Sequence, residues 1–250
     1  MPPTKEAKFY VAHPALARCA ARPGAGASEA LQTVYNQGMT RASTWSDRLI
    51  AAADEALRTL TGPTRAARPS PTAPMTEPKL DRAERDASIE LMRVNHSGEI
   101  AAQALYSGQA VFARSAQTRA HLLQAGREEQ DHLAWCQERL DELGARPSLL
   151  TPAWYAGAFT IGLIAGAAGD RTSLGFIAET EKQVEAHIHD HLDRLPPADD
   201  KSTAILEQMA SDEAHHGTTA RLAGGIDLPG PVRSAMAIGG EILRHVAAKV

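Results

Sequence analysis

Two short stretches of the sequence place a glutamate and a histidine three residues apart: Glu129 with His132, and Glu213 with His216. Both stretches have the apolar spacing of a helix, and residues i and i+3 project from the same face of a helix. A carboxylate oxygen and an imidazole nitrogen on one face can bind the same metal ion. One such pair occurs by chance in many surface helices, but two pairs on apolar stripes indicate a metal site.

Two further glutamates, Glu99 and Glu181, also occupy apolar-stripe positions of predicted helices. Four carboxylates buried in one core are unfavourable unless cations compensate their charge. Four glutamates and two histidines supply enough oxygen and nitrogen donors for two divalent first-row metals. The order Glu, Glu-x-x-His, Glu, Glu-x-x-His is the ligand pattern of ferritin-like di-iron bundles. Because any one of these glutamates could be a surface charge, the prediction depends on all four together.

The neighbours of the two motifs leave several assignments open. A rival pair at the same spacing, Asp212 and His215, lies beside the second motif, but its helix face is more polar. Asp212 and Glu128 are therefore candidates for hydrogen bonds to the outer ring N–H groups of the ligand histidines, or else surface charges. His187 is a further candidate for a position near the site. The histidines at alternate positions after it would not converge with it on one ion.

The apolar periodicity predicts an all-α fold, a ferritin-like four-helix bundle with extra helices. Its four long helices are expected at about 80–114, 116–143, 174–195 and 202–223. Each of them carries one of the four glutamates. The crossover between the two helix pairs is long, as ferritin-like topology requires.

The remaining segments are predicted from composition. Residues 1–38 have no sustained periodicity, and Met39 opens a more regular stretch. Residues 1–43 are expected to be a disordered or non-native extension. Residues 44–60 are expected to form an amphipathic helix. Residues 61–80 contain five prolines and are predicted to be a linker, and residues 81–250 are predicted to be the di-iron domain. The apolar stripe predicted for the first helix consists of Leu49, Ile50, Ala53, Leu57 and Leu60.

Residues 149–169 contain no charged side chain. The segment approaches the ~20 residues of a membrane span. Its four glycines and the lack of flanking basic clusters favour a buried or interfacial helix over a span. A last amphipathic helix is expected at about 232–249.

Composition narrows the class of protein. Apolar residues make up 43% and charged residues 22% of the sequence, as in ordinary globular proteins. The net charge of −4 gives no basic footprint for nucleic acid. Two cysteines without a recognisable secretory signal predict a reducing, cytosolic-side location and no disulfide framework.

Four motifs resemble the demethoxyubiquinol hydroxylases of ubiquinone biosynthesis. They are Arg93-Val-Asn-His-Ser-Gly-Glu99, the Glu129-x-x-His132 helix, Gly175-Phe-Ile-Ala-Glu-Thr-Glu181-Lys-Gln-Val-Glu-Ala-His187 and Asp212-Glu-Ala-His-His216. The likeness covers about residues 44–250, and all six expected ligand positions are filled.

The resemblance implies a non-haem di-iron centre with two iron ions per chain. The implied ligands are Glu99, Glu129, His132, Glu181, Glu213 and His216, with Glu129 and Glu213 shared between the ions. It also implies a peripheral enzyme on the cytoplasmic face of the cell membrane, which hydroxylates the ring of a polyprenyl methoxy-methyl benzoquinol with O₂ and a two-electron donor. The implied partners are this substrate, the membrane surface and other ubiquinone-biosynthesis proteins.

Two alternatives stay open at this point. One is another ferritin-like di-metal protein, such as a ferroxidase, a peroxide-handling protein or a di-manganese catalase, although the uncharged 149–169 segment favours a lipid substrate. The other is a lipid-binding helical bundle that keeps the ligands and catalyses nothing.

Overall fold

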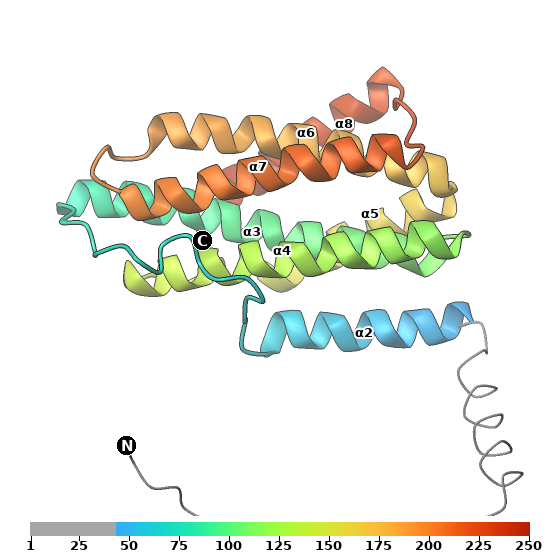
Figure 1. The fold of residues 1–250 in the computed structure, drawn as a ribbon, viewed down its shortest axis with the longest axis horizontal. Coiled ribbons are helices and arrows are strands. Elements are labelled where there is room, and N and C mark those ends of the chain that lie inside the picture. The colour runs from blue at the N-terminus through green and yellow to red at the C-terminus, as the bar shows by residue number, and fades with distance from the viewer. Residues whose placement is uncertain (1–43) are drawn as a thin grey trace, which may run out of the picture. The chain divides into compact units, whose positions relative to one another are not determined.

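Seven α-helices and no strand make up residues 44–250, the part of the chain that the computed structural model describes (Figure 1). The helices are α2 (Trp45–Thr61), α3 (Arg82–Phe112), α4 (Ala116–Glu142), α5 (Thr151–Ala167), α6 (Asp170–Arg194), α7 (Asp200–Leu222) and α8 (Gly230–Ala247). The all-α prediction is confirmed. The expectations for residues 1–43 lie outside the described residues.

The ends of the helices follow from local side-chain chemistry. A capping box of Thr44 with Asp47 begins α2, and another of Asp81 with Glu84 begins α3. Helix α6 begins four residues before the predicted position, because Gly169 adopts a positive φ of 104° and its carbonyl accepts the first helical hydrogen bond. Positive φ is costly for other residues, so glycine makes this abrupt turn from α5 into α6 possible.

The four long helices α3, α4, α6 and α7 form a bundle of two helical hairpins (Figure 1). Two clusters of buried apolar residues fill its core. The first includes Met92, Trp135, Leu140, Ile188 and Leu206, and the second includes Tyr106, Leu122, Ile177 and Ala220. Along each helix, the glutamates predicted as ligands lie in the sequence between members of the two clusters. The apolar clusters thus enclose a polar layer.

Helix α2 does not bury the predicted stripe. Its buried residue is Ala52, and Ala56 and Leu60 pack against the core cluster beneath it. Ile50 and Leu57 are 70% and 63% exposed, so these two members of the predicted apolar stripe face solvent. The small alanines at positions 52 and 56 let the helix approach its neighbour closely, and this contact overrides the face with the larger apolar side chains.

Helix α5 packs closely along α3 through glycines. A Cβ on Gly108 would lie 2.5 Å from the carbonyl oxygen of Phe159, and a Cβ on Gly162 would collide with the carbonyl oxygen of Leu105. The uncharged segment is therefore committed to the bundle surface on one side. Among residues 44–250, no helix has both the length and the apolar character needed to span a bilayer.

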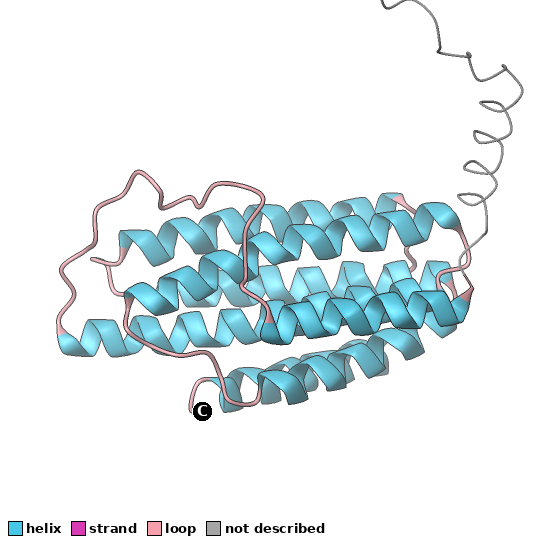
Figure 2. Cartoon of the chain, turned by 90° about the horizontal axis from the view of Figure 1, so that it is seen from below, coloured by secondary structure: helices cyan, strands magenta, loops and turns pink. Residues whose placement is uncertain are grey.

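The additional elements cover two different faces of the bundle. Figure 2 shows α5 and α8 together on one face, and the irregular segment 62–81 on the opposite face. Exposed apolar side chains on the first face include Ile161 and Ile164 of α5, and Ile238 and Ile242 of α8. The irregular segment instead lies over α4 and α7.

The α3–α5 contact predicts a sharp difference between two glycines of α5. Gly162→Ala should lower the free energy of unfolding by roughly 1–3 kcal/mol, because the added methyl overpacks a backbone contact. Gly157→Ala is the matched control, since nothing lies within 4 Å of its Cβ position. The control should be neutral or stabilising by up to about 1 kcal/mol. Thermal unfolding of both variants tests this, and equal melting temperatures would contradict it.

Candidate metal centre

The six predicted ligands lie on four helices of the bundle. Each side chain is almost completely buried, with residue exposures between 0 and 5%. The six are Glu99 of α3, Glu129 and His132 of α4, Glu181 of α6, and Glu213 and His216 of α7. Single ligand atoms of four of them, Glu99, Glu129, His132 and Glu213, all lie within 4.8 Å of one another. The helix register has therefore brought residues more than a hundred positions apart to one point.

The two Glu-x-x-His motifs face each other across the seam between α4 and α7. Glu129 places one oxygen 3.0 Å from Nδ1 of His132 and its other oxygen 3.0 Å from Nδ1 of His216. Glu213 does the same at 3.3 Å to each ring. The ring centroids are 6.3 Å apart. Two carboxylates thus span two inward imidazole nitrogens, an arrangement suited to a pair of ions.

The other two glutamates flank this central group. Glu99 Oε2 is 3.6 Å from Nδ1 of His132. Glu181 Oε1 accepts a 2.7 Å hydrogen bond from the hydroxyl of Tyr106. Tyr106 also lines a cavity of about 210 Å³ between α2, α3 and α4, together with Gln103. The tyrosine thus separates this cavity from the cluster.

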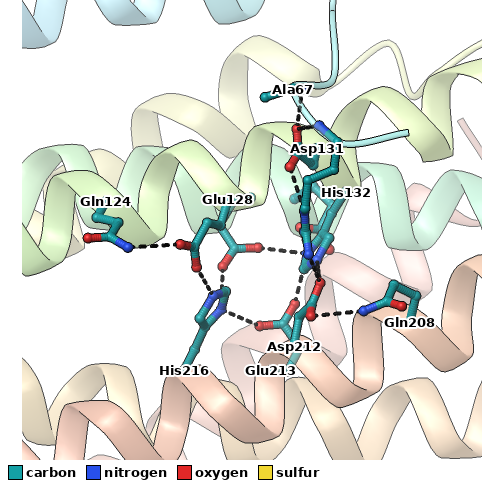
Figure 3. A network of polar contacts seen from close by, with 12 residues as sticks. Ala67, Gln124, Glu128, Asp131, His132, Gln208, Asp212, Glu213 and His216 are labelled. Atoms are coloured by element: carbon teal, nitrogen blue, oxygen red, sulfur yellow. Dashed lines mark hydrogen bonds and ion pairs between the residues drawn. The ribbon is translucent and has the colours of Figure 1, made fainter. Parts of the chain in front are cut away.

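The outer nitrogen of each histidine has a carboxylate partner (Figure 3). Nε2 of His132 lies 2.9 Å from Asp212, and Nε2 of His216 lies 2.8 Å from Glu128. These are the hydrogen bonds proposed from the sequence for Asp212 and Glu128. A carboxylate that accepts a hydrogen bond from Nε2–H leaves Nδ1 of the same ring free to bind a metal. Both histidines are therefore oriented with Nδ1 inward.

Burial and the neighbouring carboxylates shift the pKa values of the cluster. Burial, reinforced by neighbouring carboxylates, raises the pKa of Glu99 and Glu181 well above the ordinary value. Burial disfavours charge on the histidines too, but the surrounding carboxylates outweigh it, raising the pKa of His132 strongly and that of His216 to about 12. Without metal, protons and imidazolium charges compensate part of the negative charge.

Protons do not satisfy every polar atom of the cluster. Glu99 Oε2 and Glu129 Oε1 are buried and make no hydrogen bond. The contact of Glu129 Oε1 with His216 is close, but it lacks hydrogen-bond geometry. Unpartnered carboxylate oxygens beside inward imidazole nitrogens are what divalent ions require. The cluster can hold a metal ion, and its donor set fits a di-metal site.

The remaining candidates from the sequence are His215, Asp212 and His187. His215 is exposed, and Asp212 contacts His132 from outside, so the rival pair does not point inward. His187 packs its ring 3.9 Å from that of His191, and it lies near Arg244 and Glu241 of α8. None of these contacts is with one of the six ligands.

Three contacts of the site were not identified from the sequence. One is the hydrogen bond from the Tyr106 hydroxyl to Glu181, which no pattern in the sequence indicates. Asp131 binds the backbone N–H of Ala67 at 2.6 Å, and Arg68 pairs with both Asp131 and Asp212. The last two contacts come from the irregular segment, where no periodicity indicates which side chains point inward.

Comparison with known proteins agrees with this geometry. Residues 86–243, more than half of the chain, match the family model "Ubiquinone biosynthesis protein COQ7". The chain belongs to this family. It is 55% identical over 207 residues to a protein of Cupriavidus metallidurans named 3-demethoxyubiquinol 3-hydroxylase, covering 82% of this chain and 100% of that protein.

Two further relatives carry the same name. A Cupriavidus necator protein is 56% identical over 207 residues, covering 82% of this chain and 100% of the relative. A Ralstonia pickettii protein is 53% identical over 215 residues, covering 82% of this chain and 99% of the relative. The recognition made from the four motifs is confirmed, and membership of this family of hydroxylases sets aside the ferroxidase and catalase alternatives.

The pKa directions predict that metal binding releases protons. At neutral pH the metal-free cluster holds protons on His132 and His216, because the surrounding carboxylates raise the pKa of both imidazoles. Burial also raises the pKa of Glu99 and Glu181, which favours the protonated form of both carboxyl groups. Metal ligation needs neutral imidazoles and ionised carboxylates, so affinity should fall as pH falls, by about tenfold per pH unit for each proton released. Titration with Co²⁺ in a weakly buffered indicator solution measures both quantities. Binding without proton release would contradict this assignment.

Proposed function

We propose that this protein is a di-iron monooxygenase of ubiquinone biosynthesis. Its substrate would be the ring of a polyprenyl methoxy-methyl benzoquinol, demethoxyubiquinol. One atom of O₂ would enter the ring as a hydroxyl group and the other would leave as water, with two electrons and two protons supplied by a two-electron donor. The observation that carries the proposal is the pair of carboxylates spanning two inward imidazole nitrogens. The identity of the proposed substrate is taken from the relatives named 3-demethoxyubiquinol 3-hydroxylase.

The donor set favours iron and suggests which residues would hold each ion. Carboxylate-rich ligation with few imidazoles suits iron that changes oxidation state, and bound iron would supply the electrons that activate O₂. Glu129 and Glu213 would be shared by the two ions, because each presents one oxygen to each histidine. Glu99 would complete the set around His132 and Glu181 the set around His216.

The protein's own residues would keep this centre in position. The Tyr106 hydroxyl holds one oxygen of Glu181. Asp212 and Glu128 fix the two imidazole rings from outside. The apolar clusters on either side of the polar layer exclude water from it. A reactive centre shielded in this way can act on an apolar substrate without losing its oxidant to solvent.

A polyprenyl substrate requires access from a lipid phase, and we assign this role to the face with α5 and α8. Its exposed apolar side chains, Ile161, Ile164, Ile238 and Ile242, suit a helix pair that lies flat in the membrane interface. The proposed location is the cytoplasmic face of the cell membrane, with the protein bound peripherally. Other ubiquinone-biosynthesis proteins are proposed partners.

A ligand substitution tests the enzymatic proposal. Glu181→Ala should reduce formation of the hydroxylated quinone by more than about a hundredfold, because it removes a buried ligand carboxylate. Glu185→Ala, on the partly exposed side of the same helix, is the matched control. The assay is quinone composition in a strain that lacks its own hydroxylase and accumulates the demethoxy intermediate.

Iron analysis of the purified proteins accompanies this assay. We expect two irons per chain in the wild type and in the Glu185→Ala protein, and fewer in the Glu181→Ala protein. A non-catalytic lipid-binding bundle would keep its cellular role in the Glu181→Ala variant, so full complementation by that variant would reject the proposal.

Flotation with liposomes tests the membrane proposal separately. The wild type should float with the vesicles and be released by salt or carbonate. Ile238→Asp with Ile242→Asp should reduce flotation, because it places charges on an apolar face of α8. Ile50→Asp on α2 is the control, since Ile50 is also an exposed isoleucine but lies outside the proposed face. A requirement for detergent to release the protein would refute peripheral binding.

A further inference from the structure

The irregular segment between α2 and α3 is attached to the bundle across the seam between α4 and α7. Arg68 pairs with Asp131 of α4 at 2.7 Å and with Asp212 of α7 at 2.8 Å. The backbone N–H of Ala67 adds a 2.6 Å hydrogen bond to Asp131. One cation thus joins a carboxylate from each helix. We call this contact the Arg68 clamp.

A second attachment, which we call the Glu77 clamp, crosses the same seam with reversed charge. Glu77 lies 3.1 Å from Arg139 of α4 and 2.9 Å from Lys201 of α7. Arg139 is fully buried and also pairs with Asp199. The Glu77 clamp therefore holds the segment to the bundle without contacting any of the six ligands.

The Arg68 clamp differs because it reaches a ligand through one atom. Oδ2 of Asp212 lies 2.8 Å from the guanidinium of Arg68 and 2.9 Å from Nε2 of His132. The other oxygen of Asp212 accepts a hydrogen bond from Gln208 at 3.0 Å. Both oxygens are thus held, and the carboxylate cannot rotate away from the histidine without breaking a charged contact.

The aromatic neighbour of the ligand fixes the same guanidinium. The Arg68 guanidinium carbon lies 4.9 Å from the ring centroid of Trp135. Trp135 itself is buried and packs 5.5 Å from the His132 ring. One aromatic contact and two carboxylates therefore determine where the guanidinium lies. Such a geometry serves orientation, and a surface charge alone would not require it.

We propose that Arg68 is a positioning residue for the metal ligand His132. Arg68 acts through Asp212, which it holds in place. In that place Asp212 accepts a hydrogen bond from Nε2–H of His132, and this bond keeps Nδ1 of the ring directed at the metal site. Arg68 lies before the region matched by the family model, which begins at residue 86. The inference rests on the metal site of the proposed function. It adds a residue outside the four-helix bundle that positions one of the ligands.

The test compares the two clamps. Arg68→Gln removes the charge that holds Asp212, whereas Glu77→Gln breaks the other attachment of the same segment and serves as the matched control. The full-length proteins are titrated with Co²⁺, and affinity, visible d–d absorption and the melting temperature of the metal-free protein are recorded. R68Q should weaken Co²⁺ binding by at least about tenfold and alter the absorption bands. E77Q should lower only the melting temperature.

The outcomes separate this inference from the function on which it rests. A wild type that binds no Co²⁺ would reject the metal site itself. A wild type that binds while folded R68Q keeps its affinity and spectrum would reject the positioning role alone. Equal losses in R68Q and E77Q would also reject it, because the effect would then come from loosening of the seam.

A second variant covers the case in which R68Q does not fold. Asp131→Asn frees Arg68 from α4 but leaves Asp212 and His132 unchanged. It should give a smaller loss of Co²⁺ affinity, with the same direction of spectral change as R68Q. Wild-type affinity and spectrum in folded D131N would overturn the proposal in that case.

Discussion

Four carboxylates can share one layer of a helical core only if positive charge shares it with them. Each buried carboxylate would otherwise lose its hydration without compensation. In this protein two imidazoles lie between the carboxylates, yet they leave oxygens of Glu99 and Glu129 without a hydrogen bond. These oxygens favour added cations, so the capacity of the layer to hold a metal ion follows from the burial of its carboxylates.

The scaffold around the layer serves to hold this unfavourable group of charges in place. Apolar clusters on both sides stabilise the four helices independently of the site. The contact between α5 and α3 at Gly162 and Gly108 fixes the outer face of the helix that carries Glu99. Outer carboxylates then orient the imidazoles one by one. Stability and ligation thus come from different residues, which lets the interior remain polar at its centre.

The sequence predicted the bundle well because its information is periodic. Steps of three and four residues placed Glu99 and Glu181 on buried stripes, and both are buried. The same reasoning failed for α2, where Ile50 and Leu57 face solvent while Ala52 is buried. Side-chain size dominates a stripe analysis, but close helix packing selects small residues. An amphipathic pattern can therefore indicate the wrong face of a helix when alanines make the contact.

Two other features were beyond the reach of periodicity. His187 shares a helix with Glu181, but the direction of its ring depends on packing against His191 and α8. Arg68 lies in a proline-rich segment with no repeating pattern, so its partners on two distant helices could not be inferred. Contacts made by irregular backbone are set by the whole fold, and one sequence contains no local signal for them.

The attachment of residues 62–81 to α7 also constrains how the chain assembles. Arg68 and Glu77 leave the ribosome long before Asp212 and Lys201, the partners that they need on α7. During translation this segment can join α4 first, and its remaining contacts wait until nearly the whole polypeptide has emerged. The contact of Arg68 with Asp212, which lies on the outer side of His132, therefore forms only after α7 has been synthesised.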